Sequence, residues 1–256
     1  MDYTKSVQEN AARYYEESKR LRKKAEGARK AVEETERRLR ELEKEIAAEK
    51  QRKEQAKPKV KREREWFEKF RWFRASDGRL VIAGRDARQN DLLYAKYLEP
   101  NDLFFHADVH GAPVTILKDG QKAEHKILLE AAQFAASHSN AWKEGMAVCD
   151  VYALRPEQVS KTPPAGEFIA KGAFVLKGER EWFRSTELGL LVGLTETGLE
   201  SAPLLCGRGR FKVAVEIRPG NMEKGEAARR IAERLGGGIS LDELIQHLPP
   251  GKSSVK

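Results

Sequence analysis

The sequence is poor in cysteine and has no long apolar segment, and both absences narrow the class of protein. Only two of its 256 residues are cysteines, Cys149 and Cys206, and neither belongs to a CxxC pair or a cluster of metal ligands. Their apolar neighbours favour buried free thiols in a reducing cytosol over a disulfide framework. No window approaches the about eighteen uncharged apolar residues of a membrane span, and no secretion signal is evident. We therefore expect a cytoplasmic protein with no membrane association.

Proline is missing from the first 57 residues, so nothing interrupts a helix before Pro58. Apolar or small side chains recur there at alternating steps of four and three residues, which is the seam of a heptad repeat. A single helix cannot bury such a seam alone. The pattern predicts a coiled-coil helix over residues 1–57, partnered by a second copy of the chain or by a segment outside it. The seam consists of Val7, Ala11, Tyr14, Ser18, Leu21, Ala25, Ala28, Val32, Thr35, Leu39, Leu42 and Ile46.

Negative charge is in deficit at the same end of the chain. The formal net charge is +8, and residues 1–65 carry 21 Lys and Arg against 15 Asp and Glu, so most of the excess lies there. The heptad pattern dissolves into a basic linker at residues 58–65. A basic segment attracts phosphate and releases counterions, which favours RNA as a partner. The alternative is that the charge only keeps a long helix soluble.

Aromatic residues gather directly after this linker, at Trp66, Phe67, Phe70, Trp72 and Phe73. Trp66, Phe70 and Phe73 would share one face of a helix, and we favour a buried role over base stacking for them. Further along, alternating apolar patterns predict several strands. The predicted strands cover residues 79–83, 103–107, 112–117, 147–153, 167–176, 180–186, 188–195 and 211–218.

Helical patterns lie between these strands, from Asn90 to Pro100 and over residues 123–138. The mixture predicts an α+β (mixed α/β) domain over residues 66–218. Residues 219–256 are expected to form a short helical C-terminal tail. In that tail, Ser240 and Glu243 have the spacing of a capping box at the start of the last helix.

Three short motifs in the domain could carry chemistry, and the first is the run from Gly84 to Asn90 between a strand and a helix start. Glycine permits a sharp turn there, and exposed amides with Arg85 and Arg88 could meet a phosphate near the helix N-terminus. The run lacks the signature of a P-loop and the glycine spacing of a dinucleotide fold. The alternative is a local role, in which the two arginines pair with neighbouring aspartates.

The second motif is the run from His106 to His110. On an extended strand, His106, Asp108 and His110 would point to one side and could hold a metal ion or form an acid–base pair. No fourth ligand is evident, and polar side chains at a strand end commonly bond the local backbone. We favour that local role and expect no metal ion.

The third motif is the loop that begins at Lys161 and enters a predicted strand carrying Lys171 and Lys177. Its prolines stiffen it, and a rigid basic loop can grip phosphate without reading bases. An ordinary connection is the alternative. No Ser/His/Asp order, HExxH motif or carboxylate pair accompanies these motifs. We therefore expect that the chain is not an enzyme and has no cofactor.

Five runs of the sequence, at residues 6–15, 64–73, 76–78, 84–90 and 102–108, are long and specific. They resemble the NFACT family of ribosome-associated quality control factors in its archaeal form. Family members combine an N-terminal NFACT domain, helix-hairpin-helix repeats, a coiled coil with an inserted middle domain, and a C-terminal NFACT-R domain. The resemblance implies a C-terminal fragment, in which the second coiled-coil helix precedes the NFACT-R domain.

The resemblance further implies a function in the rescue of stalled ribosomes. Family members bind a large ribosomal subunit obstructed by peptidyl-tRNA and recruit tRNA, so that untemplated C-terminal tails are added to the stalled chain. The implied partners are the large subunit with its rRNA, tRNA, and the missing coiled-coil helix or a second copy of the chain. The acidic–basic pair of the N-terminal NFACT domain has no counterpart here, so this fragment could bind RNA without supporting tailing.

The family motifs around Gly84 and His106 are carried over as RNA-facing or motif-supporting positions. Bacterial-type members have Asn in place of Asp86, which argues against a direct phosphate contact by that residue. A coiled-coil scaffold or an adhesin-like protein-binding module without RNA function is the alternative. The expected RNA-binding residues are Arg85, Asp86, Arg88, Gln89, Asn90, His106, Asp108, His110, Lys161 and Lys171.

Overall fold

The computed structural model describes residues 4, 6–55, 65–163 and 168–256, with only the backbone at residues 47–55. The chain divides into two compact units, residues 1–62 and 63–256, and each is described by itself. Pro58 and nearly all of the expected basic linker lie outside the described residues.

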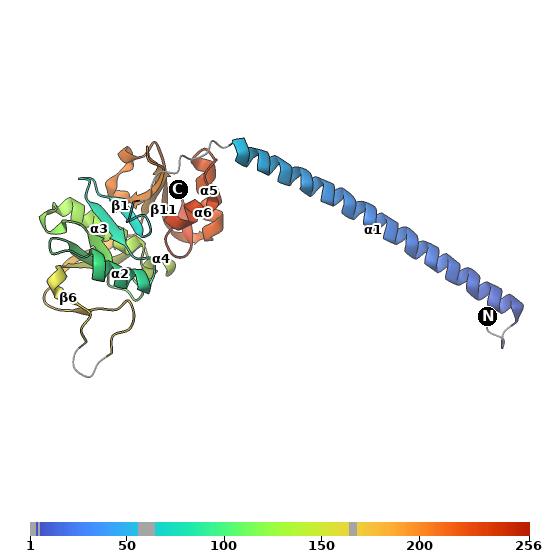
Figure 1. Ribbon diagram of the computed structural model, residues 1–256, viewed down its shortest axis with the longest axis horizontal. Helices are drawn as coiled ribbons and strands as arrows, with labels where there is room; N and C mark the ends of the chain where they lie inside the picture. Colours follow the sequence, from blue (N-terminus) through green and yellow to red (C-terminus); the bar gives the residue numbers. More distant parts are fainter. Residues whose placement is uncertain (1–3, 5, 56–64, 164–167) are drawn as a thin grey trace. The chain divides into compact units, whose positions relative to one another are not determined.

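The first unit is one helix of 49 residues, α1 (Val7–Gln55), drawn in blue in Figure 1. It begins with a capping box, in which the Ser6 N–H donates to Glu9 Oε2 at 2.9 Å and the Glu9 N–H donates to Ser6 Oγ at 3.3 Å. Side chains of the heptad seam are exposed, with Leu21 at 55% and Leu39 at 56%. The long helix is confirmed, and its pairing with a second helix stays a prediction.

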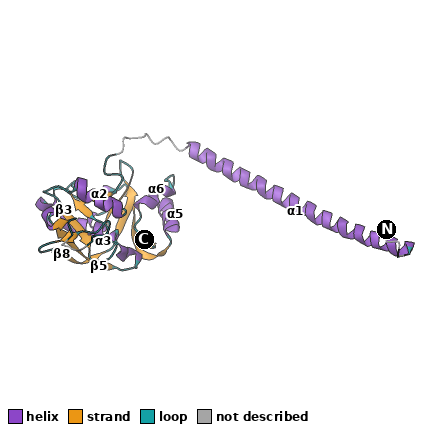
Figure 2. Ribbon diagram, turned by 60° about the horizontal axis from the view of Figure 1, so that its bottom comes forward, coloured by secondary structure: helices purple, strands orange, loops and turns teal. Residues whose placement is uncertain are grey.

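The second unit is built on a six-stranded sheet in the order β1-β2-β4-β3-β5-β8. Every neighbouring pair in this sheet is antiparallel. Its orange strands are visible in Figure 2. The strands are β1 (Arg71–Arg74), β2 (Leu80–Ala83), β3 (Leu103–Ala107), β4 (Thr115–Leu117), β5 (Val148–Leu154) and β8 (Glu181–Glu187).

A second sheet of four antiparallel strands has the order β10-β9-β11-β12, and β6 pairs with β7 in a small separate sheet. Residues 219–256, expected as a helical tail, also contribute β12, whose Val255 pairs with Ile217 of β11. The strands are β6 (Val159–Ser160), β7 (Val175–Leu176), β9 (Leu190–Leu194), β10 (Leu199–Pro203), β11 (Val213–Met222) and β12 (Ser253–Val255).

Side chains alternate between the two faces of the six-stranded sheet, as the period of two requires. Phe105 points to the face that α3 (His125–Ser137) covers together with the second sheet. Phe104 points to the opposite face, where α2 (Ala87–Tyr97) packs. The remaining helices are α4 (Asn140–Lys143), α5 (Lys224–Arg234) and α6 (Leu241–His247), of which α5 and α6 lie side by side (Figure 2). The α+β class is confirmed.

The aromatic segment after the linker does not form a helix. Residues 66–69 are in turns, and Phe73 lies in β1. Phe70 and Phe73 are fully buried, as expected for core residues, whereas Trp66 is 44% exposed and stacks on Tyr97 with ring centroids 4.6 Å apart. The burial of Phe70 and Phe73 in the domain core therefore decides the local structure, and the helix that their spacing suggested does not form.

Several element boundaries also differ from the sequence expectations. α2 begins at Ala87, three residues before Asn90, because Asp86 caps it. Ser240 lies at the N-cap of α6, but its side chain makes no capping hydrogen bond, so the expected capping box does not form there. Of the described residues in the strand expected at 167–176, only β7 is a strand. The sequence patterns did not predict β10 or β12.

Candidate nucleic-acid interface

The ends of β2 and β3 lie at the same edge of the six-stranded sheet. β4 lies between them and is antiparallel to both, so β2 and β3 run in the same direction. Arg71, the first residue of β1, pairs with Ala83 at the end of β2 and is therefore at this edge too. The sheet topology thus brings together the turns that follow Ala83 and Ala107, which contain the first two motifs.

The turn from Gly84 to Asn90 is held by its own side chains. Asp86 has an extended backbone (φ −153°, ψ 176°), and its Oδ1 accepts a hydrogen bond of 2.8 Å from the Gln89 N–H. Asn90 is buried, and its Oδ1 accepts a hydrogen bond of 3.2 Å from the Val114 N–H just before β4. A Cβ at position 84 would lie 2.1 Å from Asn90 Oδ1, so glycine is required by this close approach.

Arg85 and Gln89 tie this turn to distant parts of the chain. The Arg85 guanidinium donates to the backbone carbonyls of Lys69, Phe70 and Gln246, at 3.3, 3.2 and 2.9 Å. Gln89 accepts from the Arg85 N–H at 3.0 Å and donates to the Lys69 carbonyl at 3.2 Å. The hydrogen bonds of Arg85 go to backbone carbonyls and not to an aspartate, as the alternative weighed from the sequence would require. Arg85 and Gln89 thus use, for hydrogen bonds within the domain, the same side-chain groups that would contact RNA.

The second motif begins in a strand and continues into a turn. β3 ends at Ala107, so Asp108 and His110 follow in a turn and do not continue the alternation of the strand. His106 Nδ1 and the Tyr152 hydroxyl share a hydrogen bond of 3.3 Å. Burial lowers the pKa of His106. Among the described residues, no group of three or more His, Cys, Asp or Glu could hold a metal ion.

The third motif is fastened to α2 through Asp91. Its Oδ1 accepts from Lys161 Nζ at 2.6 Å and from the Gly172 N–H at 3.0 Å. Lys161 Nζ also lies over the ring of Phe174, 4.5 Å from the centroid. Lys161 is therefore engaged in holding the loop, whereas Lys171 is exposed. Residues 164–166 of this motif lie outside the described residues.

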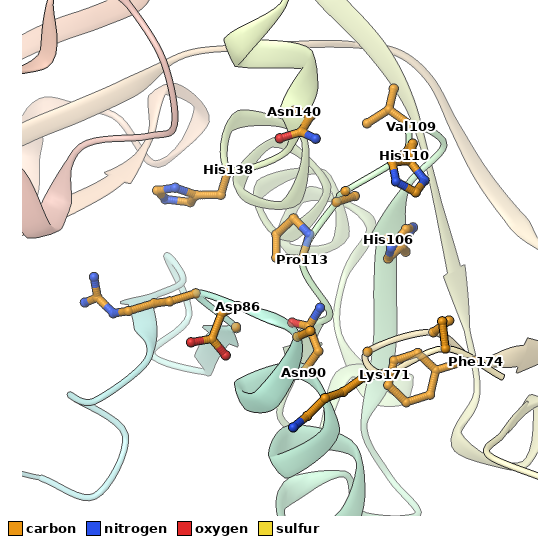
Figure 3. Close-up of a pocket in the computed structure, with 18 of the residues that line it drawn as sticks. Asp86, Asn90, His106, Val109, His110, Pro113, His138, Asn140, Lys171 and Phe174 are labelled. Atoms are coloured by element: carbon orange, nitrogen blue, oxygen red, sulfur yellow. The ribbon is translucent and has the colours of Figure 1, made fainter.

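One cavity of about 640 Å³ has residues of all three motifs in its wall (Figure 3). Small-molecule sites commonly have volumes of about 300–1,000 Å³. Of the expected RNA-binding residues, Arg85, Asp86, Asn90, His106, His110 and Lys171 line this cavity, whereas Arg88, Gln89, Asp108 and Lys161 do not. The motifs thus share one site, although they are far apart in the sequence.

The expected RNA-binding set lacks four other residues that line the cavity: Arg71, His138, Asn140 and Phe174. They come from β1, from the end of α3, from the start of α4, and from the segment before β7. No local motif joins them, because each belongs to a different element. Only the fold places them beside the motifs that the sequence does reveal.

Arg71 is the cation at the sheet edge. Its Nη1 donates to the Gly84 carbonyl at 2.8 Å, while its Nε has no hydrogen-bond partner within the described part of the chain. Burial, with a smaller contribution from Arg85, lowers the pKa of Arg71 to about 10. Arg71 is still charged at neutral pH, so a cation faces the cavity from beneath the Gly84 turn.

His138 is the least satisfied polar group of the cavity wall. Its side chain is 3% exposed, and neither ring nitrogen has a hydrogen-bond partner among the residues that the structure describes. An unpaired buried polar group costs about 1–3 kcal/mol. Burial, followed by the nearby charges of Arg71, Arg85 and Lys224, lowers its pKa well below the usual value. Asp86 is the only carboxylate in the described wall, so the site as a whole favours an anion.

The domain's architecture and its basic cavity fit a comparison with protein-family models. Residues 69–178 match the model described as the NFACT protein RNA binding domain. This range contains all three motifs and most of the cavity wall. Over residues 69–178 the second unit thus matches an RNA-binding domain, and its fold is of the α+β class.

The chain belongs to the NFACT family, whose curated relatives are named ribosome quality control proteins, and the resemblance of its motifs is confirmed. It is 41% identical to "Archaeal Rqc2 homolog aRqcH" of Methanocaldococcus jannaschii over 203 residues, which are 77% of this chain and 30% of that protein. It is 34% identical to the NEMF homolog of Drosophila melanogaster over 202 residues, 76% of this chain and 20% of that protein. The chain thus spans less than a third of either relative.

Among solved structures, the C-terminal part of the fibronectin/fibrinogen-binding protein from Streptococcus suis matches at 22% identity with a TM-score of 0.40, over 51% of this chain and 49% of that chain. A likeness this weak carries no argument about function. None of the helices within the described residues is long and apolar enough to cross a membrane.

Proposed function

We propose that this chain is the RNA- and ribosome-binding part of a ribosome-associated quality control factor. In this role it binds the large ribosomal subunit obstructed by peptidyl-tRNA, together with tRNA, in the cytosol. The bound complex then promotes C-terminal tailing of the stalled nascent chain. The ribosome performs the peptide transfer, and the chain acts as a binding factor and not as an enzyme.

The observation that carries this proposal is the convergence of three separate motifs on one cationic cavity. The wall combines Arg71, Lys171 and three histidines with one carboxylate. Such a surface favours phosphate oxygens over the mixed surface of a protein partner. The names of the relatives agree with this assignment.

We also propose that α1 pairs with a second helix, from the coiled coil of a longer protein or from another copy of this chain. Its exposed seam supports this pairing, because Leu39 and Leu42 are each about half exposed, at 56% and 49%. The helix α1, with the basic linker that follows it, forms a basic arm that would then hold the RNA-binding domain at the ribosome by protein contacts. Its basic excess adds attraction to rRNA.

Electrophoretic binding of the full chain to tRNA and to purified large subunits, at low and at high salt, tests the proposal. We expect complexes that weaken steeply with salt. Lys171→Ala, at the exposed rim of the cavity, should weaken them, whereas Lys126→Ala should not, because Lys126 is exposed on α3 outside the cavity wall. Absence of any complex at low salt would exclude RNA binding and leave the scaffold or adhesin-like alternative.

A further inference from the structure

The cavity has two chemically different sides. Figure 3 shows His138 and Asp86 on one side, His106, His110 and Phe174 on the other, and Asn90 with Pro113 between them. The first side is cationic and has buried nitrogens without hydrogen-bond partners in the described structure, while the second presents planar rings. A ligand that fills both sides must itself have an anionic end and a flat end.

Positive groups outnumber negative ones on the cationic side, where Asp86, the only carboxylate in the described wall, acts on Arg71 electrostatically. Arg71 Nε and both ring nitrogens of His138 are buried without hydrogen-bond partners in the described structure. Lys224 and His247 are close enough to lower the pKa of His138 electrostatically. A phosphate oxygen would accept from Arg71 Nε and from the one N–H of the neutral His138 ring.

The N-terminus of α2 adds donors beside this cluster. Asp86 engages only the Gln89 N–H, and the N–H groups of Ala87 and Arg88 have no acceptor within a helix that begins at Ala87. The carboxylate of Asp86 repels an anion on the helix axis itself. A phosphate is therefore expected near Arg71 and His138, away from the Asp86 carboxylate and not directly above the helix end.

The opposite side is prepared for a planar group. Lys161 Nζ lies 4.5 Å from the ring centroid of Phe174, and the ring centroids of Phe174 and Tyr94 are 5.1 Å apart. These two contacts hold the Phe174 ring in place. His106 is fixed by its hydrogen bond to Tyr152. Aromatic rings that are already in place stack on bases with little loss of side-chain freedom.

Asn140 supplies an amide at the top of the cavity, where hydrogen bonds to the edge of a base can form. Its position is set by Gly111, since a Cβ at Gly111 would lie 2.2 Å from Asn140 Nδ2. Gly111 also has φ +77°, a conformation that favours glycine. The glycine therefore admits the amide to the cavity.

We propose that this cavity binds one unpaired RNA nucleotide, with its phosphate at the His138 side and its base at the Phe174 side. The inference rests on the RNA-binding function proposed above and adds the class of ligand. The bases of a duplex are paired and stacked and cannot enter a cavity of about 640 Å³, so the nucleotide must come from a single strand, a bulge or a chain end. The basic arm and the outer surface would bind duplex regions without filling the cavity.

Calorimetric titration of the full chain with CMP and AMP, and with single-stranded and duplex oligonucleotides, tests this inference. We expect the mononucleotides to bind and to displace the single strand but not the duplex. His138→Leu should lower mononucleotide affinity by at least about tenfold, as for the loss of a charge-assisted hydrogen bond. It should leave the melting temperature unchanged or raised, because it removes nitrogens that have no partner. His125→Leu, on the same helix but outside the cavity wall, is the matched control.

Should His138→Leu fail to fold, His110→Ala at the exposed rim tests occupation of the cavity from the base side, and it should also weaken mononucleotide binding. If inorganic phosphate competes as well as CMP does, the base side has no role and the nucleotide assignment is overturned. If tRNA binds the wild type and His138→Leu equally and mononucleotides do not compete, the inference fails while the proposed function stands. If mononucleotides bind but no RNA does, the cavity is a site for free nucleotides, and both the RNA assignment and the proposed function fail.

Discussion

The carbonyl oxygen of the Asn90 side chain occupies the place where any residue other than glycine would put its Cβ at position 84, with 2.1 Å between the two. The same oxygen accepts the Val114 N–H, which anchors the start of β4 beside the end of β2. The pair therefore fixes the edge of the sheet on which the cavity is built. Its disruption should affect the fold before it affects binding.

Gly84→Ala is expected to lower the free energy of unfolding by about 1–3 kcal/mol, because the added methyl group must displace Asn90. Urea denaturation measures the change. Gly225→Ala is the matched control: no atom lies within 4 Å of its added Cβ, and it lies in α5. That substitution should stabilise the protein by up to about 1 kcal/mol. Equal effects at the two positions would contradict the role given to Asn90.

Arg85→Ala and Arg88→Ala should separate structural from surface arginines. Arg85 donates to three backbone carbonyls, including that of Gln246, so its removal should destabilise the domain by about 2 kcal/mol or more. Arg88 is exposed, and its removal should change stability by less than about 0.5 kcal/mol. Thermal unfolding of both variants distinguishes them. An unchanged melting temperature for Arg85→Ala would show that its hydrogen bonds do not hold the turn.

Buried histidines should make the fold sensitive to mild acid. Burial, with Arg85 next, lowers the pKa of His247 to about 4, and the pKa of His138 is also lowered. Below about pH 6.5 these histidines bind protons in the unfolded chain but stay neutral in the folded domain. The free energy of unfolding therefore falls as the pH drops from about 6.5 toward 4. Each fully neutral group contributes a slope of at most about 1.4 kcal/mol per pH unit.

Urea denaturation across that pH range checks this expectation. His247→Gln should flatten the dependence, because it removes one of the titrating groups. His125→Gln should not, since His125 is exposed. The same slope in the wild type and His247→Gln would contradict the assignment.

Asp91 is expected to control the order of the segment that closes the cavity. Asp91→Asn removes the ion pair with Lys161 while keeping an acceptor for the Gly172 N–H. Both charges are about one-third exposed, so global stability should change by about 1 kcal/mol or less. Amide hydrogen exchange of residues 168–176 should nevertheless become faster. Asp108→Asn, an exposed carboxylate outside the cavity wall, should leave that exchange unchanged.

How far the sequence predicted the fold depended on whether the partners of a residue were local. β3 was predicted to the residue, because the run from Leu103 to Ala107 is apolar on both faces of a buried strand. β10 was missed because its Glu200 suggests a surface loop. In the structure Glu200 is 8% exposed and is paired with Arg210 at 2.8 Å. No pattern within the strand reveals that compensation.

The residues of the candidate site likewise fall into those that the sequence reveals and those that only the fold reveals. The turn at Gly84 and the run at His106 stand out because their residue types are unusual for their positions. Arg71 and His138 do not, since each looks like an ordinary polar residue at the boundary of an element. Their shared property is a buried side-chain nitrogen without a hydrogen-bond partner among the described residues, and it exists only once β1 and the end of α3 have been brought to the same edge.

Site-specific crosslinking tests most directly the claim that the edge of the sheet beside α2 faces RNA. A photoreactive residue at position 110, on the exposed rim of the cavity, would be compared with one at position 126, which is exposed outside its wall. Each full chain would be bound to large ribosomal subunits and to tRNA at low salt. The account predicts RNA adducts from position 110 that disappear as salt is raised, and few from position 126. Adducts of equal yield at the two positions, or none at position 110, would contradict it.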